Sequence, residues 1–227
     1  MIEKAKKLAG ERAADLVESG QVVGLGTGST AYFAIMRLAE RVSSGLEIRG
    51  IPTSEASATL ARDNNIPLIS FSDTVSIDIT IDGADEVDAA FNLIKGGGGA
   101  LLREKIVAGA TQKQIIVADE SKLKKTLGAF PLPVEVTRFG WEATTSHITE
   151  LGCTPEIRIA DGSPFVTDNG NFILDCPFPE IANPADLETA LRSIPGVVEC
   201  GLFVDLTDRV IIGKNDGTIE ELTEPSK

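Results

Sequence analysis

Two short glycine-rich segments carry residue types that bind anions. Gly24–Thr30 reads GLGTGST and Lys95–Gly99 reads KGGGG, and each lies between an apolar run and a helix-length segment. Glycine lets the backbone turn tightly and direct its N–H groups outward, and a helix that starts there adds the positive end of its dipole. Both segments therefore predict the binding of a phosphate or a similar anion.

The first glycine segment fits one phosphate better than a dinucleotide. From Gly26 it can be written as G-x-G-x-x-A, but that fingerprint needs an acidic residue at the end of the next strand, where Ile51–Ser54 offers hydroxyls. The P-loop pattern G-x-x-x-x-G-K-[ST] is absent. The hydroxyls of Thr27, Ser29 and Thr30 suit one phosphate or the hydroxyls of a sugar. The alternative is a tight turn whose serine caps the helix.

Carboxylates follow the next apolar runs. Asp82–Asp88 (DGADEVD) places four acids in seven residues, which suits acid–base work on a sugar or a divalent cation, although the spacing is not that of an EF-hand. Glu104 lies on the first turns of the helix after the second glycine segment, within reach of that loop. The alternatives are a solvated acidic turn for Asp82–Asp88 and an exposed i,i+4 partner for Glu104. Lys122 adds positive charge to the same region or is a surface lysine.

The residue types that are missing narrow the chemistry. The single histidine, His147, falls in a later segment, so a Ser-His-Asp triad or an HExxH zinc site cannot be built. Acid–base work must then fall to carboxylates and lysine. This set fits proton abstraction beside a carbonyl on a small phosphorylated substrate, with donors that stabilise an enediolate. A metal-assisted hydride shift remains a rival mechanism, weakened by the lack of histidines.

Charge and composition limit the partners and the compartment. The 227 residues include 34 acidic and 21 basic side chains, a net charge of −13 that disfavours nucleic acid and anionic membrane surfaces. Only residues 95–125 are net positive, which indicates an anion site or a solvated basic helix face. Apolar runs are strand-length, Met1–Lys7 does not resemble a signal peptide, and the three cysteines suit neither a zinc site nor a disulfide framework. We therefore expect a cytoplasmic protein.

The elements that position these motifs alternate between strand and helix up to about residue 128. The apolar spacing predicts helices over 5–17, 56–64 and 100–110, a further helix through 35–42 that Gly45 closes, and strands over 21–25, 46–51, 66–70, 77–81 and 114–118. This order is typical of a Rossmann-like parallel sheet with crossover helices. In such a sheet, ligands bind beyond the carboxyl ends of the strands, where we expect all of these motifs to lie.

The pattern changes after Pro131. Strands over 134–137, 156–159, 172–174 and 197–204 and helices over 142–151 and 184–193 give the order β-α-β-β-α-β of a ferredoxin-like α+β unit. The Asn169-Gly170 pair predicts a hairpin between Phe165–Thr167 and the strand at 172–174. A last strand, Arg209–Gly213, is expected to return to the first sheet. We therefore predict an α/β catalytic domain over 1–130 and 205–227, with a small domain inserted at 131–204.

Six motifs in this order resemble the type A ribose-5-phosphate isomerase family: GLGTGST, PTSEAS, DGADEVD, KGGGGALLREK, DESK and FPLPVEV. The segments GNFILD (170–175) and IPGVVECGLF (194–203) extend the resemblance over nearly the whole chain. It implies a cofactor-free and metal-free aldose–ketose isomerase that interconverts ribose 5-phosphate and ribulose 5-phosphate in the pentose phosphate pathway. It also implies a homodimer, with a tetramer as the alternative.

The resemblance assigns roles that the residues alone leave open. It makes Glu104 the general base and gives Asp82, Asp85 and Lys95 the tasks of ring opening and of stabilising charge at O1 and O2. The substrate-binding positions that it implies are Thr27, Gly28, Ser29, Thr30, Asp82, Gly83, Ala84, Asp85, Lys95, Gly96, Gly97, Gly98 and Lys122.

Two rival functions stay open on the sequence. A non-catalytic sugar-phosphate sensor needs the glycine loops but has no need of Glu104, and it would usually carry a DNA-binding segment. A sugar-phosphate deaminase or lactonase of related fold would be expected to use a histidine near the site, whereas His147 falls in the small domain.

Overall fold

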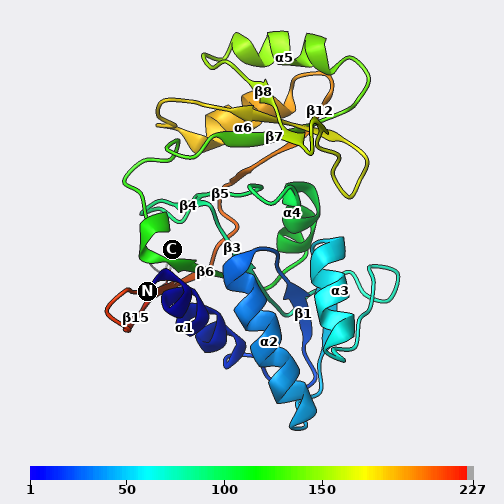
Figure 1. Cartoon of the computed structure of the whole chain (residues 1–227), viewed down its shortest axis with the longest axis vertical. Helices are drawn as coiled ribbons and strands as arrows, with labels where there is room; N and C mark the ends of the chain where they lie inside the picture. Colours follow the sequence, from blue (N-terminus) through cyan, green and yellow to red (C-terminus); the bar gives the residue numbers. More distant parts are fainter. Residues whose placement is uncertain (224–227) are drawn as a thin grey trace. The chain divides into compact units, whose positions relative to one another are not determined.

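The computed structural model describes residues 1–223 and divides the chain into two compact units (Figure 1). Within the described residues, the first unit contains Met1–Ala84, Arg103–Leu123 and Asp205–Thr223. The second contains Asp85–Leu102 and Lys124–Val204. No helix within the described residues has the length and apolar character needed to cross a bilayer.

A six-stranded sheet forms the centre of the first unit. Its order is β15-β14-β6-β3-β1-β2, and every neighbouring pair is parallel except β14 and β15. The chain leaves β1 for an outer strand and then returns to β3 on the other side of β1, so the switch point lies between β1 and β3. The strands are β1(Val22–Leu25), β2(Arg49–Pro52), β3(Ile79–Gly83), β6(Gln114–Asp119), β14(Arg209–Gly213) and β15(Ile219–Thr223).

Helices cover both faces of this sheet. α1(Ile2–Ala14) and α2(Ser29–Ser43) lie side by side on one face, and α3(Glu55–Asp63) packs on β2 (Figure 1). Alternate strand residues such as Val23 and Ile81 face these helices, because successive side chains in a strand point to opposite faces. On the other face, Val107 of α4(Leu101–Gly109) packs with Val22 and Ile77. This arrangement confirms the predicted α/β class.

The second unit contains an antiparallel sheet of order β12-β7-β11-β8, the strand order of a ferredoxin-like fold. Its elements are β7(Leu132–Val136), α5(Trp141–Thr149), β8(Glu156–Ile157), β11(Phe172–Cys176), α6(Pro184–Arg192) and β12(Val197–Cys200). The core between the sheet and its helices includes Leu174, Ile148 and Leu191. Cys153, Cys176 and Cys200 are buried free thiols in the same core.

The second unit also contains residues that the sequence placed in the first domain. β4(Glu86–Val87) and β5(Leu93–Ile94) form a small antiparallel sheet with β13(Leu202–Phe203). The carboxylate of buried Glu86 accepts hydrogen bonds from the N–H groups of Gly128 and Phe130, both 2.8 Å long. Residues 85–102 and 124–130 therefore join the predicted 131–204 segment in one unit.

Two predicted strands are wrong. Residues 66–70 form no strand and make only an isolated bridge between Leu68 and Gly50. Phe165–Thr167 does not pair with β11, which lies between β7 and β8. The hairpin is instead made by β9(Ile159–Ala160) and β10(Ser163–Pro164). The turn at Asn169-Gly170 does form, closed by the bond from the N–H of Gly170 to the carbonyl of Thr167.

Candidate active site

In the first unit, the loop after β1 meets the end of β3. The N–H of Gly26 donates to the carbonyl of Ile81 at 3.0 Å, and the N–H of Thr27 donates to Asp82 Oδ1 at 3.0 Å. The same Asp82 oxygen accepts the N–H of Gly83 at 2.7 Å, and the residue is fully buried. The first glycine segment and the acidic segment therefore adjoin at the carboxyl ends of β1 and β3, as the sequence predicts; Ala84 follows them, half-buried.

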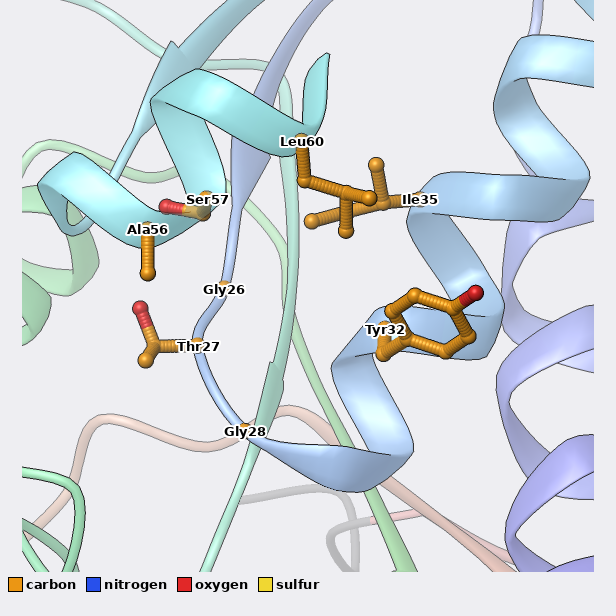
Figure 2. Close-up of a pocket in the computed structure, with 8 residues that line it drawn as sticks. All are labelled: Gly26, Thr27, Gly28, Tyr32, Ile35, Ala56, Ser57 and Leu60. Carbon is orange, nitrogen blue, oxygen red and sulfur yellow. The ribbon is translucent and has the colours of Figure 1, made fainter. Parts of the chain in front are cut away.

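The side chain of Thr27 is fixed by hydroxyl groups at the end of β2. Its Oγ1 lies 2.7 Å from Thr53 Oγ1 and 2.8 Å from Ser54 Oγ. These hydroxyls occupy the place where a dinucleotide fingerprint requires an acid. Figure 2 shows a small cavity beside this loop, in which the side chain of Thr27 lies near Ala56 and the rest of the lining comes from α2 and α3.

The next residues of the loop start α2, and Gly28 and Ser29 are exposed to solvent. Gly28 is the N-cap and supplies no side-chain cap for the first N–H groups, while Ser29 is exposed and Thr30 is buried. Lys6 of α1 donates from Nζ to Ser29 Oγ at 2.9 Å. A helix N-terminus with a lysine and a serine beside it is suited to a phosphate. The sequence analysis missed Lys6, because helical spacing shows which face of α1 is buried but not which helix lies next to it.

Two further predicted residues lie at element ends in the first unit. Glu104 is in the first turn of α4 and its side chain is buried, with 5% exposed. Lys122 ends the 3-10 turn η1(Glu120–Lys122) after β6 and is half-buried. Buried Asp119 caps that turn by accepting the N–H of Ser121 at 3.0 Å. The carboxyl end of β6 is thus a third strand end with a predicted site residue.

In the second unit, the other glycine segment is joined to Asp85. The N–H of Gly97 donates to Asp85 Oδ2 at 2.8 Å, and the N–H of Asp85 donates to the carbonyl of Ile94 at 2.8 Å. Lys95 is almost completely buried, with 2% exposed, and its Nζ lies 5.5 Å from the ring centroid of Phe203. This segment follows β5 of the small antiparallel sheet, so the expectation that it ends a strand of the parallel sheet is wrong.

Three of the predicted site residues are buried although their side chains are ionisable. Asp82, Lys95 and Glu104 expose 0%, 2% and 5% of their surface, and removing a charge from water costs several kcal/mol unless other groups compensate it. Such groups are candidates for functional sites. Within residues 1–223, the side chains close enough together to share a metal ion are Glu188, Glu199 and Cys200 in the second unit. None of these is a predicted site residue.

The sequence model of the family described as ribose 5-phosphate isomerase A (phosphoriboisomerase A) matches residues 49–217. The chain belongs to this family. It is 55% identical to ribose-5-phosphate isomerase A of Bacillus cereus, over 96% of this chain and 99% of that protein. It is 53% identical to ribose-5-phosphate isomerase A 1 of Oceanobacillus iheyensis, over 94% of this chain and 96% of that protein.

Solved structures of the isomerases agree with the fold. Ribose 5-phosphate isomerase from Plasmodium falciparum superposes with a TM-score of 0.94 at 39% identity, covering 99% of this chain and 100% of that one. A D-ribose-5-phosphate isomerase in complex with phospho-erythronic acid gives a TM-score of 0.95 at 40% identity, covering 98% and 99%. The predicted family and its isomerase activity in the pentose phosphate pathway are confirmed, and the sensor, deaminase and lactonase alternatives are not favoured.

Proposed function

We propose that this chain interconverts ribose 5-phosphate and ribulose 5-phosphate through a cis-enediolate, with Glu104 as the general base and without a cofactor. The observation that carries the proposal is the burial of two carboxylates and one lysine, Asp82, Glu104 and Lys95, at the predicted positions. A base in a water-poor environment transfers protons efficiently at neutral pH when its pKa approaches the working pH.

The reaction needs one proton to move between neighbouring carbons. Glu104 takes the proton from C2 of the open-chain aldose, the electron pair forms the C1=C2 double bond, and negative charge develops on O1. The protonated Glu104 then returns the proton to C1. The hydroxyl proton of O2 moves to O1, and O2 becomes the carbonyl oxygen of the ketose.

We propose that the other three ionisable residues act on the oxygen atoms of the substrate. Lys95 stabilises the negative charge on the enediolate, because a buried ammonium interacts strongly with an anion in a low-dielectric environment. Asp82 and Asp85 accept and donate the hydroxyl protons during ring opening and during the exchange between O1 and O2. Gly96, Gly97 and Gly98 lie near this reacting end.

We place the phosphate at the start of α2. Gly28, Ser29 and Thr30 offer N–H and hydroxyl groups there, and Thr27 is held beside them by Thr53 and Ser54. Lys6 supplies a positive charge through its contact with Ser29, and we propose it as a phosphate ligand that the sequence analysis did not include. Lys122 adds a second positive charge.

Deuterium transfer tests the reaction directly. The purified chain is mixed with ribose 5-phosphate in deuterated water containing excess EDTA, and ribulose 5-phosphate is followed by NMR. We expect the ketose to form with deuterium at the transferred position, because a carboxyl base exchanges its proton with solvent. Failure to form ketose, with substrate binding intact, contradicts the proposal. Ketose that forms only when a metal is added back contradicts the metal-free mechanism.

Removing the base tests the assignment of Glu104. Glu104→Gln keeps the size of the side chain but cannot take a proton, so we expect kcat to fall by roughly 100-fold or more. Binding of phospho-erythronic acid, which a relative holds in its solved complex, should be retained within a few fold. Near-normal turnover of this variant assigns the base to another residue.

We also propose that the chain forms a homodimer in the cytoplasm. Three buried free thiols support a reducing compartment. Sedimentation equilibrium at twice the mass of the chain supports the dimer, and the mass of a monomer contradicts it.

A further inference from the structure

One arginine in the second unit contacts the backbone of the glycine segment directly. Arg158 lies between β8 and β9, and 14% of its side chain is exposed. Its Nη1 donates to the carbonyl oxygen of Gly96 at 2.9 Å and to that of Gly97 at 3.1 Å. Its Nε and Nη2 donate to the two carboxylate oxygens of Asp175 at 2.9 and 2.5 Å. One guanidinium therefore connects the sheet of this unit to two consecutive peptide groups.

These contacts fix the direction in which the glycine N–H groups point. The C=O and N–H of a trans peptide point in opposite directions, and the described chain contains no cis peptide bond. Because the Gly96 carbonyl accepts a hydrogen bond from Arg158, the N–H of Gly97 in the same peptide must point away from the arginine. This N–H donates to Asp85 Oδ2 at 2.8 Å. The Gly97 carbonyl also accepts a hydrogen bond from Arg158, so the N–H of Gly98 in the next peptide points away from the arginine as well. Gly98 is exposed there.

The glycine segment needs such an external restraint. Four consecutive glycines have more conformational freedom than any other tetrapeptide, and ordering them is correspondingly costly. Their internal restraint is the turn bond from the N–H of Gly99 to the carbonyl of Gly96, 3.0 Å long. A Cβ on Gly97 would lie 2.7 Å from Asp85 Oδ1, so glycine is required for the close approach of this carboxylate.

The arginine is itself held rigidly. The bidentate contact with Asp175 fixes the plane of the guanidinium, and the ring of Phe165 lies 5.9 Å from its central carbon. A lysine is a point charge without this planar fork, so it could not hold Asp175 and two carbonyl groups in the same geometry. The arrangement is therefore specific to arginine.

We propose that Arg158 is a positioning residue of the isomerase, which holds the Gly96–Gly97 carbonyls so that Asp85 and the N–H of Gly98 face the O1–O2 edge of the enediolate. This inference rests on the proposed function of Asp85 and the glycine segment. The cation also polarises both peptides and strengthens their N–H groups as donors. Arg158 touches no substrate; it acts through the loop.

A positioning role for Arg158 predicts that its loss weakens binding at one end of the substrate and not at the other. The residues to which we assign the phosphate are in the first unit, whereas Arg158 acts on the loop assigned to the enediolate. Phospho-erythronic acid carries a phosphate and a carboxylate whose two oxygens resemble those of the enediolate, and inorganic phosphate carries only the first group. Loss of Arg158 should lower the affinity for phospho-erythronic acid and leave the affinity for inorganic phosphate unchanged.

The test uses Arg158→Lys, with Asp175→Asn as a second variant that loosens the arginine without removing it. Arg138→Lys is the matched control, because Arg138 is an exposed arginine of the same unit that lies over the ring of Phe172. We expect Arg158→Lys to lower kcat by roughly 10- to 100-fold and to raise Ki for phospho-erythronic acid about 10-fold. Ki for inorganic phosphate should stay within about twofold. Asp175→Asn should show a weaker change of the same kind, and Arg138→Lys none.

Two outcomes overturn the proposal: unchanged kcat and Ki in Arg158→Lys, or an equal loss of affinity for both inhibitors, which indicates a merely structural role. A readout that does not need turnover keeps this result separate from a failure of the proposed function. In glycine-labelled protein, phospho-erythronic acid should shift the Gly98 amide resonance in the unmodified chain and in Arg138→Lys, but not in Arg158→Lys. A shift retained in Arg158→Lys contradicts the positioning role even if the unmodified chain proves inactive.

Discussion

At the scale of single residues, Gly26 lies directly against the backbone at the end of β3. A Cβ built on Gly26 would lie 2.5 Å from both Asp82 Cα and the carbonyl oxygen of Ile81. These are backbone atoms, so no side-chain rotation can relieve the overlap. The glycine is therefore required for the contact between the first glycine segment and the end of β3.

Gly26→Ala should separate the two strand ends. Overpacking a buried position costs about 1–3 kcal/mol, so we expect a lower melting temperature. We also expect kcat to fall at least 10-fold, because Asp82 must move. Thermal unfolding and steady-state kinetics check both.

Gly109→Ala is the control for that substitution. Gly109 ends α4, and a Cβ there has no neighbour within 4 Å. Alanine in a helix is favoured over glycine by about 0.5–1 kcal/mol, so this variant should be as stable as the unmodified chain or more stable, with unchanged kinetics. Equal behaviour of the two variants would show that the approach at Gly26 is unimportant.

The sequence predicts part of this site and cannot predict the rest. Glycines and hydroxyls after one strand and acids after the next must converge in a parallel sheet, and the contact of Thr27 with Asp82 confirms it. Lys6 and Arg158 are missing from the prediction because each reaches its partner from a distant element. The roles of Glu104, Lys95 and Asp85 stay predictions that only kinetics can test.

At the scale of elements, the start of α3 is coupled to the first glycine segment. Ser54 caps α3 by accepting the N–H of Ser57 at 3.0 Å, and the Ser57 hydroxyl accepts the N–H of Ser54 at 3.1 Å. The Ser54 hydroxyl also accepts from Thr27 Oγ1 at 2.8 Å. One side chain therefore stabilises a helix and restrains a loop assigned to the phosphate.

Ser54→Ala should affect stability and binding together. Loss of an N-cap costs about 1 kcal/mol of unfolding free energy. Loss of one hydrogen bond to Thr27, worth about 0.5–1.5 kcal/mol, should raise KM for the sugar phosphate roughly 2- to 10-fold. Urea unfolding and steady-state kinetics measure the two effects.

Asn183→Ala provides the matched control in the second unit. Asn183 caps α6 by accepting the N–H of Asp186, and it makes no contact with a predicted site residue in the described structure. We expect a similar loss of stability with KM unchanged. If KM rises equally in both variants, the effect of Ser54→Ala comes from general destabilisation and not from Thr27.

Element prediction failed where the local pattern was ambiguous. Residues 66–70 are apolar enough for a strand, but the backbone pairs only at Leu68. β15 alternates between exposed and half-buried residues, so the sequence lacks the apolar face that indicates a strand. Ser54 does cap α3, as a serine just before the predicted helix over 56–64 indicates, because N-capping depends on the local sequence alone.

At the scale of the whole molecule, Glu86 connects the separate chain segments of the second unit. Its buried carboxylate accepts the N–H groups of Gly128 and Phe130, next to Leu127 in the core that contains the three cysteines. The hydrogen bond to Cys153 and the burial of its side chain raise the pKa of the Cys176 thiol, so the reactive thiolate is absent near neutral pH. Labelling of Cys176 therefore reports the opening of this core.

Glu86→Gln should accelerate that labelling. The amide presents an NH₂ group to one of the two backbone donors, and bonds to a charged acceptor are worth about 1.5–3 kcal/mol, so labelling at pH 8 should be roughly 10- to 100-fold faster. Glu180→Gln, which changes an exposed glutamate of the same unit, should label at the original rate. Equal labelling rates in the two variants would show that Glu86 does not stabilise this core.

The position of β14 has a consequence for biosynthesis. β14 is the partner of β6 in the parallel sheet, yet about 90 residues, including most of the second unit, separate the two strands in the chain. At translation rates of ~5–20 residues per second, β6 waits roughly 5–18 s for this neighbour. During that interval, the apolar edge at Ile115–Val117 is an unpaired strand, the kind of surface on which nascent chains aggregate and chaperones act. The nascent chain should therefore depend most on chaperones after β6 has left the ribosome and before β14 is made.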